Sequence, residues 1–441
     1  MPTSPWEQIL VMIRITRFLN PRRVHDQVRP EIINDRAFVA PEEEAGKDSA
    51  VPQLDLGFSH PANSLLRQAE HYFGGERAYR LAFSPSQPAV EMHRLAGRAD
   101  ILTRIIRSIE DLDLHVILYG ARGIGKTSIL RVVQGLAEKA DFMVHYVSCG
   151  PSASFCEVFR SLAARIPLLY DQESDPTGSA SEKGRTLADR LPEGEFSVSQ
   201  LTDLLSAIQG IRVLLVLDEF DRSEPKEFRQ AIGELIKNLS DRLIRVQLVI
   251  GGVADNITQL VTQIPSIQRN IVGIQIPNLT QAETREMLDI AEQQGNVRFD
   301  EQARRDLTVA SAGLPYLVGL IGQHSVRFGV DDGTSWINQT HVARAVQQAV
   351  DDLASRLSLR STHSIEQILR GPHAALLNRA AAAEVHSGGL VLDAKIVSDL
   401  AKNREVFAGL LQKLPDDPRD AWRFSEDGAA GLVWLSSVRL N

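Results

Sequence analysis

The sequence contains little cysteine, and this scarcity excludes two kinds of protein. Cys149 and Cys156 are its only cysteines in 441 residues, which is too few for a disulfide framework. No group of cysteines and histidines elsewhere has the ligand spacing of a structural zinc site. We therefore expect neither a disulfide-stabilised scaffold nor a zinc-dependent fold. Both thiols are interpreted as packing residues in a reducing, cytoplasmic environment.

Long apolar runs are also absent. No stretch of about 18 uncharged apolar residues occurs anywhere, so we expect a soluble protein without a membrane partner. The apolar stretch 9–13 is the best candidate for a targeting segment, but Glu7 precedes it and Arg14 and Arg17 follow it. We expect no secretory signal there, and interpret the segment as a helix that packs on its own domain or on a neighbouring subunit.

The sequence has no excess of positive charge either. Its formal net charge is −8 at pH 7. A protein that binds polyanions over its whole surface is strongly basic, so any contact of this chain with nucleic acid must be local.

The composition and length indicate several domains. Apolar residues make up 43% of the sequence, enough for more than one hydrophobic core. Residues 34–64 are rich in proline, alanine and acidic residues without periodicity, which is typical of a linker. We predict an N-terminal helical appendage and linker over 1–94, a core over 95–278, a helical lid over 279–360 and a small C-terminal domain over 361–441. No internal repeat is evident.

Short apolar runs and helical patterns alternate through the predicted core. The runs cover 114–119, 142–147, 213–217, 246–250 and 272–276, and helical spacing occurs between them. This alternation predicts an α/β fold in which helices cover both faces of a parallel sheet. The polar stretch 171–184 has no such pattern and is predicted to be a surface insertion.

Strands are expected to stop after Pro277. Helical spacing over 281–294, 300–311, 317–328 and 341–357 predicts a bundle for the lid. Further helical patterns follow, and then two alternating apolar runs flank Asp427 and Gly428, which is typical of a hairpin turn. Helices followed by a hairpin predict a winged-helix-like α+β domain at the C-terminal end.

One segment fits the pattern of a phosphate-binding loop at every position. It consists of Gly120, Ala121, Arg122, Gly123, Ile124, Gly125, Lys126, Thr127 and Ser128. Its glycines let backbone N–H groups turn toward phosphates, Lys126 brings a positive charge to the outer phosphates, and Thr127 offers a hydroxyl to Mg²⁺. We therefore expect ATP and Mg²⁺ to bind at this segment.

Two acids follow the apolar run 213–217. Asp218, at the end of a buried strand, can hold a carboxylate close to the Mg²⁺ that Thr127 binds. Glu219 lies one residue further, on the other side of the strand end, where it can polarise the water that attacks the terminal phosphate. The pair predicts hydrolysis of ATP, with Asp218 on the metal side and Glu219 as a catalytic residue.

With these motifs the sequence resembles the AAA+ ATPases, close to the origin-recognition and archaeal initiator ATPases and to the STAND signalling ATPases. The resemblance covers about residues 95–360. It implies that Gly97 and Arg98 form a box against the nucleotide base. Ala99 and Asp100 stand where STAND proteins favour glutamate, so the box is only partial.

The resemblance also implies three site residues outside these motifs. Asn256, or else Asp255, corresponds to a catalytic polar sensor. Arg269 looks like the arginine finger that is offered to a neighbouring subunit, and an ordinary surface arginine is the alternative. Pro315 belongs to a Gly-x-Pro like that of STAND lids, where initiators carry a sensor arginine. A proline that merely starts a helix is the alternative reading of Pro315.

We therefore expect an ATPase that acts as a Mg²⁺-dependent switch, forms a homo-oligomer and controls a protein or DNA partner. Residues 361–441 hold nine basic and ten acidic residues, so a protein partner is favoured there and DNA stays open. The alternative is a signalling or scaffold module that holds ATP or ADP, hydrolyses slowly and recruits an effector without binding DNA, for example in a bacterial defence system.

Overall fold

The structure is a computed structural model of the whole chain, and it describes residues 83, 95–171, 184–223, 226–252, 265–414, 420–438 and 440. The predicted appendage and linker, apart from Phe83, lie outside the described residues. So do most of the predicted insertion and both candidates for the polar sensor, Asp255 and Asn256.

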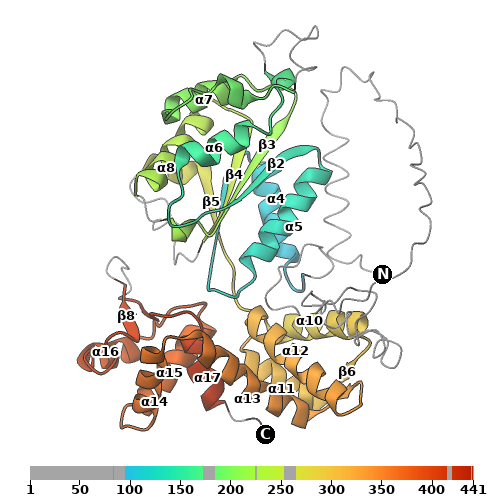
Figure 1. Cartoon of the computed structure of the whole chain (residues 1–441), viewed down its shortest axis with the longest axis vertical. Coiled ribbons are helices and arrows are strands. Elements are labelled where there is room, and N and C mark those ends of the chain that lie inside the picture. The colour runs from blue at the N-terminus through green and yellow to red at the C-terminus, as the bar shows by residue number, and fades with distance from the viewer. Residues whose placement is uncertain are drawn as a thin grey trace, which may run out of the picture.

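A five-stranded parallel sheet forms the centre of the predicted core (Figure 1), with its strands in the order β2-β3-β4-β1-β5. Its strands are β1 (His115–Tyr119), β2 (Phe142–Ser148), β3 (Arg212–Asp218), β4 (Val246–Gly252) and β5 (Ile271–Gln275). The five apolar runs predicted all of them, because a strand that is buried on both faces consists almost entirely of apolar residues.

Alternate residues of the strands belong to two separate cores. On β3, Leu214 and Val216 pack toward α4 (Ala99–Glu110) and α5 (Lys126–Lys139). Leu215 and its alternate neighbours on β3 pack toward the opposite layer. That layer consists of α6 (Phe155–Ala163), α7 (Val198–Ser206) and α8 (Lys226–Asp241). The predicted α/β fold with helices on both faces is confirmed.

The lid contains the four expected helices, α10 (Gln281–Gly295), α11 (Glu301–Ser311), α12 (Pro315–Asp331) and α13 (Gln339–Arg356). The expectation that strands stop after Pro277 is wrong, because β6 (Arg298–Phe299) pairs in parallel with β7 (Trp336–Ile337). Two residues are too short for an apolar run to reveal a strand. Phe83 packs into the lid core beside Phe299, with ring centroids 6.0 Å apart.

The C-terminal part contains the expected helices and a hairpin, but the hairpin is not where the sequence suggested. It comprises α14 (Leu359–Leu369), α15 (Ala374–His386), α16 (Ala394–Lys402), β8 (Leu411–Lys413), β9 (Trp422–Phe424) and α17 (Ala429–Ser437). The hairpin is formed by β8 and β9, whereas the second predicted run is α17. This helix is buried on most sides, so its residues show no helical period and resemble a buried strand.

The lid and the C-terminal helices share one hydrophobic core, in which α17 packs on α13 and α15. The indole N–H of Trp434 on α17 donates a hydrogen bond to the carbonyl oxygen of Ala310 on α11, at 2.8 Å. The four domain boundaries stay predictions. Among the described residues, no helix has the length and apolar character needed to cross a bilayer.

Candidate nucleotide site

The phosphate loop (residues 120–128) joins β1 to α5 at the carboxyl edge of the sheet. Lys126 is the first residue of α5, so the start of this helix directs its first N–H groups and its positive dipole end at the loop. Gly123 and Gly125 have φ values of 75° and 93°, in the left-handed region that favours glycine. The backbone of the loop is therefore suited to hold an anion.

Lys126 points into this loop. Its ammonium donates hydrogen bonds to the carbonyl oxygens of Gly120 and Ala121, both at 2.8 Å. Burial lowers the pKa of Lys126 to about 8, although the carboxylates of Asp221 and Asp218 favour the charged form. An ammonium that has lost part of its water attracts a phosphate more strongly than one on the surface.

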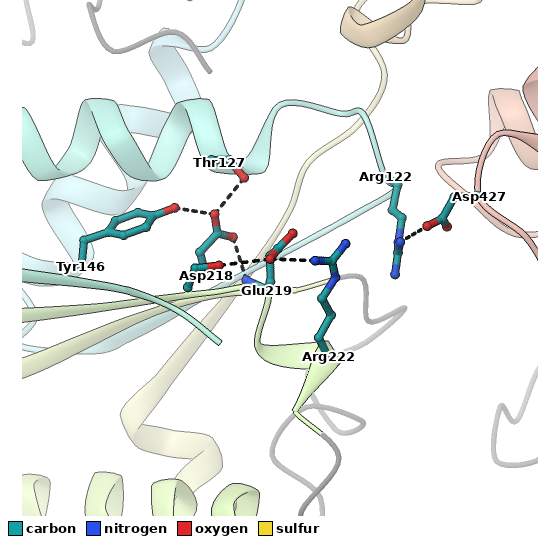
Figure 2. A network of polar contacts seen from close by, with 8 residues as sticks. Arg122, Thr127, Tyr146, Asp218, Glu219, Arg222 and Asp427 are labelled. Carbon is teal, nitrogen blue, oxygen red and sulfur yellow. Dashed lines mark hydrogen bonds and ion pairs between the residues drawn. The ribbon is translucent and has the colours of Figure 1, made fainter. Parts of the chain in front are cut away.

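Thr127 and Asp218 meet, as the two sequence motifs together predict. The Thr127 hydroxyl donates a hydrogen bond to Asp218 Oδ2 at 2.8 Å (Figure 2), and Asp218 is only 3% exposed. Oxygen ligands of this kind are those that Mg²⁺ prefers. Among the described residues no group of three acidic, histidine or cysteine side chains could hold a metal. Mg²⁺ would thus use Thr127, Asp218 and the oxygens of a bound phosphate.

Glu219 follows Asp218 in a strained conformation. Its φ of 54° lies in the left-handed region, at a cost of about 1–3 kcal/mol for a residue other than glycine. Its carboxylate accepts hydrogen bonds from the Ser148 hydroxyl at 3.1 Å and from the Arg222 guanidinium at 3.0 Å. Arg222 lies on the short 3-10 helix η4 (Phe220–Arg222). Two donors of the same domain therefore hold this carboxylate.

The C-terminal part of the chain touches the phosphate loop. Arg122 forms an ion pair with Asp427, which lies in the turn between β9 and α17 (Figure 2). A Cβ on Gly389 would lie 3.2 Å from Ala121, so this second C-terminal segment also approaches the loop. Sequence motifs alone did not suggest either contact.

The lid reaches the same loop through α12. Pro315 is the first residue of this helix, and the backbone N–H of Tyr316 donates a hydrogen bond to the Gly123 carbonyl at 3.1 Å. Gly313, with φ of 73°, lies so close to Leu279 that a Cβ would come within 2.1 Å of its carbonyl oxygen. The Gly-x-Pro segment thus brings the start of α12 to the phosphate loop. A contact of Pro315 with nucleotide stays a prediction.

Arg98 lies at the junction of core and lid. Its guanidinium donates a hydrogen bond to the carbonyl of Pro277 at 2.8 Å, and the residue is 2% exposed. Burial lowers the pKa of Arg98. The backbone N–H of Gly97 donates to Glu286 Oε2 on α10 at 3.0 Å. This segment joins the two parts of the chain, and a contact of Arg98 with the nucleotide base stays a prediction.

Arg269 lies at the end of the sheet opposite to the phosphate loop, where the strands begin. It is exposed on the 3-10 helix η5 (Pro265–Asn270), directly before β5. The strand β5 runs parallel to β1. Arg269 therefore lies at the amino ends of the strands, whereas the phosphate loop lies at their carboxyl ends. The length of β1, about 17 Å, separates the two. The structure therefore does not bring Arg269 to the phosphate loop of its own chain.

Cys149 lies next to the site but is no candidate nucleophile. It is 1% exposed, and its backbone N–H donates a hydrogen bond to the Asp218 carbonyl at 2.8 Å. Burial, reinforced by the nearby carboxylates, raises the pKa of the thiol to about 12. The thiol therefore stays protonated, which agrees with its interpretation as a packing residue.

Sequence reasoning missed three polar residues of the site: Tyr146, Ser148 and Arg222. Tyr146 and Ser148 lie on β2, and the register of β2 and β3 pairs Ser148 with Asp218. Tyr146 and Ser148 occupy alternate positions of β2, on the same side of the strand as the buried Phe142 and Val144, and this pattern was a signal. It acquires meaning only once the sheet order is known, because β2 and β3 are far apart in the sequence.

Comparison with known proteins extends these observations. Residues 94–250 match the family model described as the AAA ATPase domain. No protein of curated function matches the chain.

Several solved structures show a distant likeness to the chain. The RuvB Holliday junction branch migration motor of Thermotoga maritima is 16% identical, with 77% of this chain and 96% of that chain covered and a TM-score of 0.42. Cdc6p of Pyrobaculum aerophilum is 16% identical, with 82% and 99% covered and a TM-score of 0.44. The ORC1 protein of Aeropyrum pernix, solved with DNA, is 14% identical, with 81% and 97% covered and a TM-score of 0.42. Likeness at this level says nothing about partners.

Proposed function

We propose that this chain, whose residues 94–250 belong to the AAA ATPase domain family, binds ATP with Mg²⁺, hydrolyses it and acts as a molecular switch. The observation that carries the proposal is the contact of Thr127 with Asp218 beside the phosphate loop. A hydroxyl at a helix start and a nearly buried carboxylate on the next strand but one make a site for a phosphate-bound Mg²⁺.

Binding of the phosphates uses groups that are already in place. The N–H groups of the phosphate loop and the Lys126 ammonium neutralise the charge of the outer phosphates. Lys126 exchanges its two carbonyl partners for phosphate oxygens, so no new side chain has to enter the loop. When bound, Mg²⁺ withdraws charge from the phosphate oxygens, and Thr127 and Asp218 would hold it.

Glu219 is the proposed general base for hydrolysis. A water attacks the terminal phosphorus, the bond to the bridging oxygen breaks, and Glu219 accepts the proton of the water. The hydrogen bonds from Ser148 and Arg222 are both accepted by Oε2, so Oε1 is the oxygen proposed to accept the proton. Two donors of its own domain thus orient the proposed base.

The position of Arg269 supports the proposal that the chain forms an oligomer. An arginine finger stabilises the charge of the transferring phosphate, and this arginine lies at the sheet edge opposite to its own phosphate loop. It can complete only the site of another copy. The proposed assembly is a homo-oligomer in which each site borrows an arginine from its neighbour.

Two variants test the proposed activity. Lys126→Ala should reduce ATP affinity by at least a hundredfold, because a partly desolvated charge on the phosphates is lost. Glu219→Gln should keep the affinity within a few fold but reduce the turnover rate by at least a hundredfold. Calorimetric binding and phosphate release measure the two quantities. Unchanged ATP affinity of Lys126→Ala would show that the phosphate loop is not the site.

A slowly hydrolysing module that recruits an effector is the second candidate, and the two hydrogen bonds that hold Glu219 favour it. Turnover per molecule separates the candidates. In the assembly, turnover rises with protein concentration, and Arg269→Ala abolishes the rise, whereas Arg285→Ala on the exposed face of α10 does not. Slow turnover that is independent of concentration in all three proteins would favour the second candidate.

The partner that the switch controls is proposed to be a protein. The C-terminal residues 361–441 carry nearly equal numbers of basic and acidic residues, so their composition offers no excess of positive charge for phosphates. Duplex DNA titrated at increasing salt is the direct check. Binding that weakens steeply with salt and is lost when the C-terminal part is removed would make DNA the partner instead.

A further inference from the structure

A tyrosine takes part in the hydrogen bonds of Asp218. Tyr146 lies on β2, where Phe142 and Val144 at alternate positions are buried in the core between the sheet and α5. In the register of the sheet Tyr146 faces Val216, two residues before Asp218. Its hydroxyl donates a hydrogen bond to Asp218 Oδ2 at 2.5 Å (Figure 2).

The ring of Tyr146 is fixed on both sides. One side packs against the apolar core between the sheet and α5. The Arg131 guanidinium of α5 lies over the ring, 3.5 Å from its centroid. Arg131 itself donates a hydrogen bond to Gln134 Oε1 at 3.1 Å. Because the ring cannot turn freely, the direction of its hydroxyl is determined before any ligand arrives.

Three donors share the carboxylate of Asp218. Oδ2 accepts from Tyr146 and Thr127, and Oδ1 accepts from the backbone N–H of Glu219 at 2.8 Å. The hydroxyl of Tyr146 is the donor in its contact with Oδ2, because a carboxylate oxygen only accepts. Thr127 and the Glu219 N–H flank the carboxylate, but only Tyr146 approaches it from β2.

We propose that Tyr146 is a positioning residue for Mg²⁺: it holds Asp218 Oδ2 in the orientation in which this oxygen binds the Thr127 hydroxyl and supports the cation. The inference rests on the proposed function. A hydroxyl whose proton is donated to a fixed carboxylate is a better metal ligand than one that is free to rotate. Without Tyr146, Oδ2 keeps only one donor, and the carboxylate can rotate away from Thr127.

Tyr146→Phe tests the inference, because it removes the hydroxyl but keeps the ring under Arg131. ADP binding is measured without turnover, first in excess EDTA and then across a Mg²⁺ titration. We expect the affinity in EDTA to stay within twofold of wild type. The Mg²⁺ concentration that gives half of the gain in affinity should rise about tenfold, the usual loss when a partner of a metal ligand is removed. Tyr170→Phe, on the 3-10 helix η2 (Leu168–Tyr170), is the matched control and should change neither value.

A second variant separates positioning from a general effect on the fold. In an Asp218→Asn background, Tyr146→Phe should add less than twofold to the Mg²⁺ requirement, because the carboxylate on which it acts is gone. A wild-type Mg²⁺ requirement in Tyr146→Phe, or a lower one, would overturn the inference, as would additive effects of the two substitutions. Failure of the wild-type protein to bind ADP at all would instead overturn the proposed function.

Discussion

At the scale of single residues, two buried groups of the site have different partners. The Asp218 carboxylate accepts three hydrogen bonds. Among the described residues, Lys126 donates to two neutral carbonyls, and burial lowers its pKa to about 8 although nearby carboxylates favour the charged form. A bound phosphate would add negative charge directly at this ammonium. Nucleotide binding should therefore be coupled to the protonation of this one residue.

ATP affinity at saturating Mg²⁺ should depend on pH between about 7.5 and 9.5. Well below pH 8 Lys126 is charged in the free protein, so the affinity is constant. Above pH 8 the ammonium loses its proton, binding must take that proton up again, and the affinity falls by up to about tenfold per pH unit. Calorimetry at a series of pH values measures the fall.

Lys126→Arg is the control for this pH dependence. A guanidinium stays charged throughout the range, so the variant should show a flat profile even if its affinity is lower at every pH. A flat profile in the wild-type protein would contradict the coupling.

Residues that belong to one local motif could be predicted from the sequence, and residues that meet through the sheet could not. The spacing of Lys126 and Thr127 is fixed along the chain, and Asp218 follows a recognisable strand. Tyr146 reaches Asp218 only because β2 and β3 are neighbours in a particular register. The contact of Arg122 with Asp427 spans 305 positions and depends on how whole parts of the chain pack.

At the scale of helices and strands, periodicity predicted elements whose two sides differ or that are long enough to be recognised. The strands of the sheet and the helices α10 to α13 belong to this group. Periodicity did not predict α17, which is apolar on most sides, or the two-residue strands β6 and β7. In these elements, packing against neighbours decides the conformation, and the local pattern carries too little information.

The connection from α11 to α12 depends on one glycine. Gly313→Ala should lower the thermal midpoint by several degrees, because the alanine pays for a left-handed φ and its Cβ meets the carbonyl of Leu279. Gly333→Ala is the matched control: its φ is 74°, and nothing lies within 4 Å of an added Cβ. The control should lose only the conformational part, about 1 kcal/mol. Equal midpoints for the two variants, measured by calorimetry, would contradict the role of the close contact.

At the scale of the whole molecule, the lid and the C-terminal part both contact the phosphate loop. The turn that carries Asp427 is held in place, because Glu426 accepts hydrogen bonds from the backbone N–H of Ser358 at 2.8 Å and from the Ser361 hydroxyl at 2.7 Å. Arg122 therefore links the phosphate loop to this turn of the C-terminal part.

Asp427→Asn should speed nucleotide association, since it weakens the contact that closes over the loop. The ion pair is partly exposed, so it contributes at most about 1 kcal/mol, which limits the gain to about fivefold. Stopped-flow association of a fluorescent nucleotide, compared at one fixed salt concentration, measures the rate.

Asp420→Asn breaks a comparable exposed ion pair, with Lys413, in the same part of the chain. This control should leave the association rate unchanged. An equal gain in both variants would show that the effect belongs to surface charge in general and not to the contact with Arg122.

The parallel sheet gives the molecule a direction. Its phosphate loop lies at one end of the strands and Arg269 at the other, so copies that share sites bring opposite ends of their sheets together, either head to tail or antiparallel across a twofold axis. An open head-to-tail stack has one complete site fewer than it has copies, whereas a closed ring or a twofold pair completes them all. The fraction of chains that hydrolyse nucleotide in a single round would therefore report whether the assembly is closed.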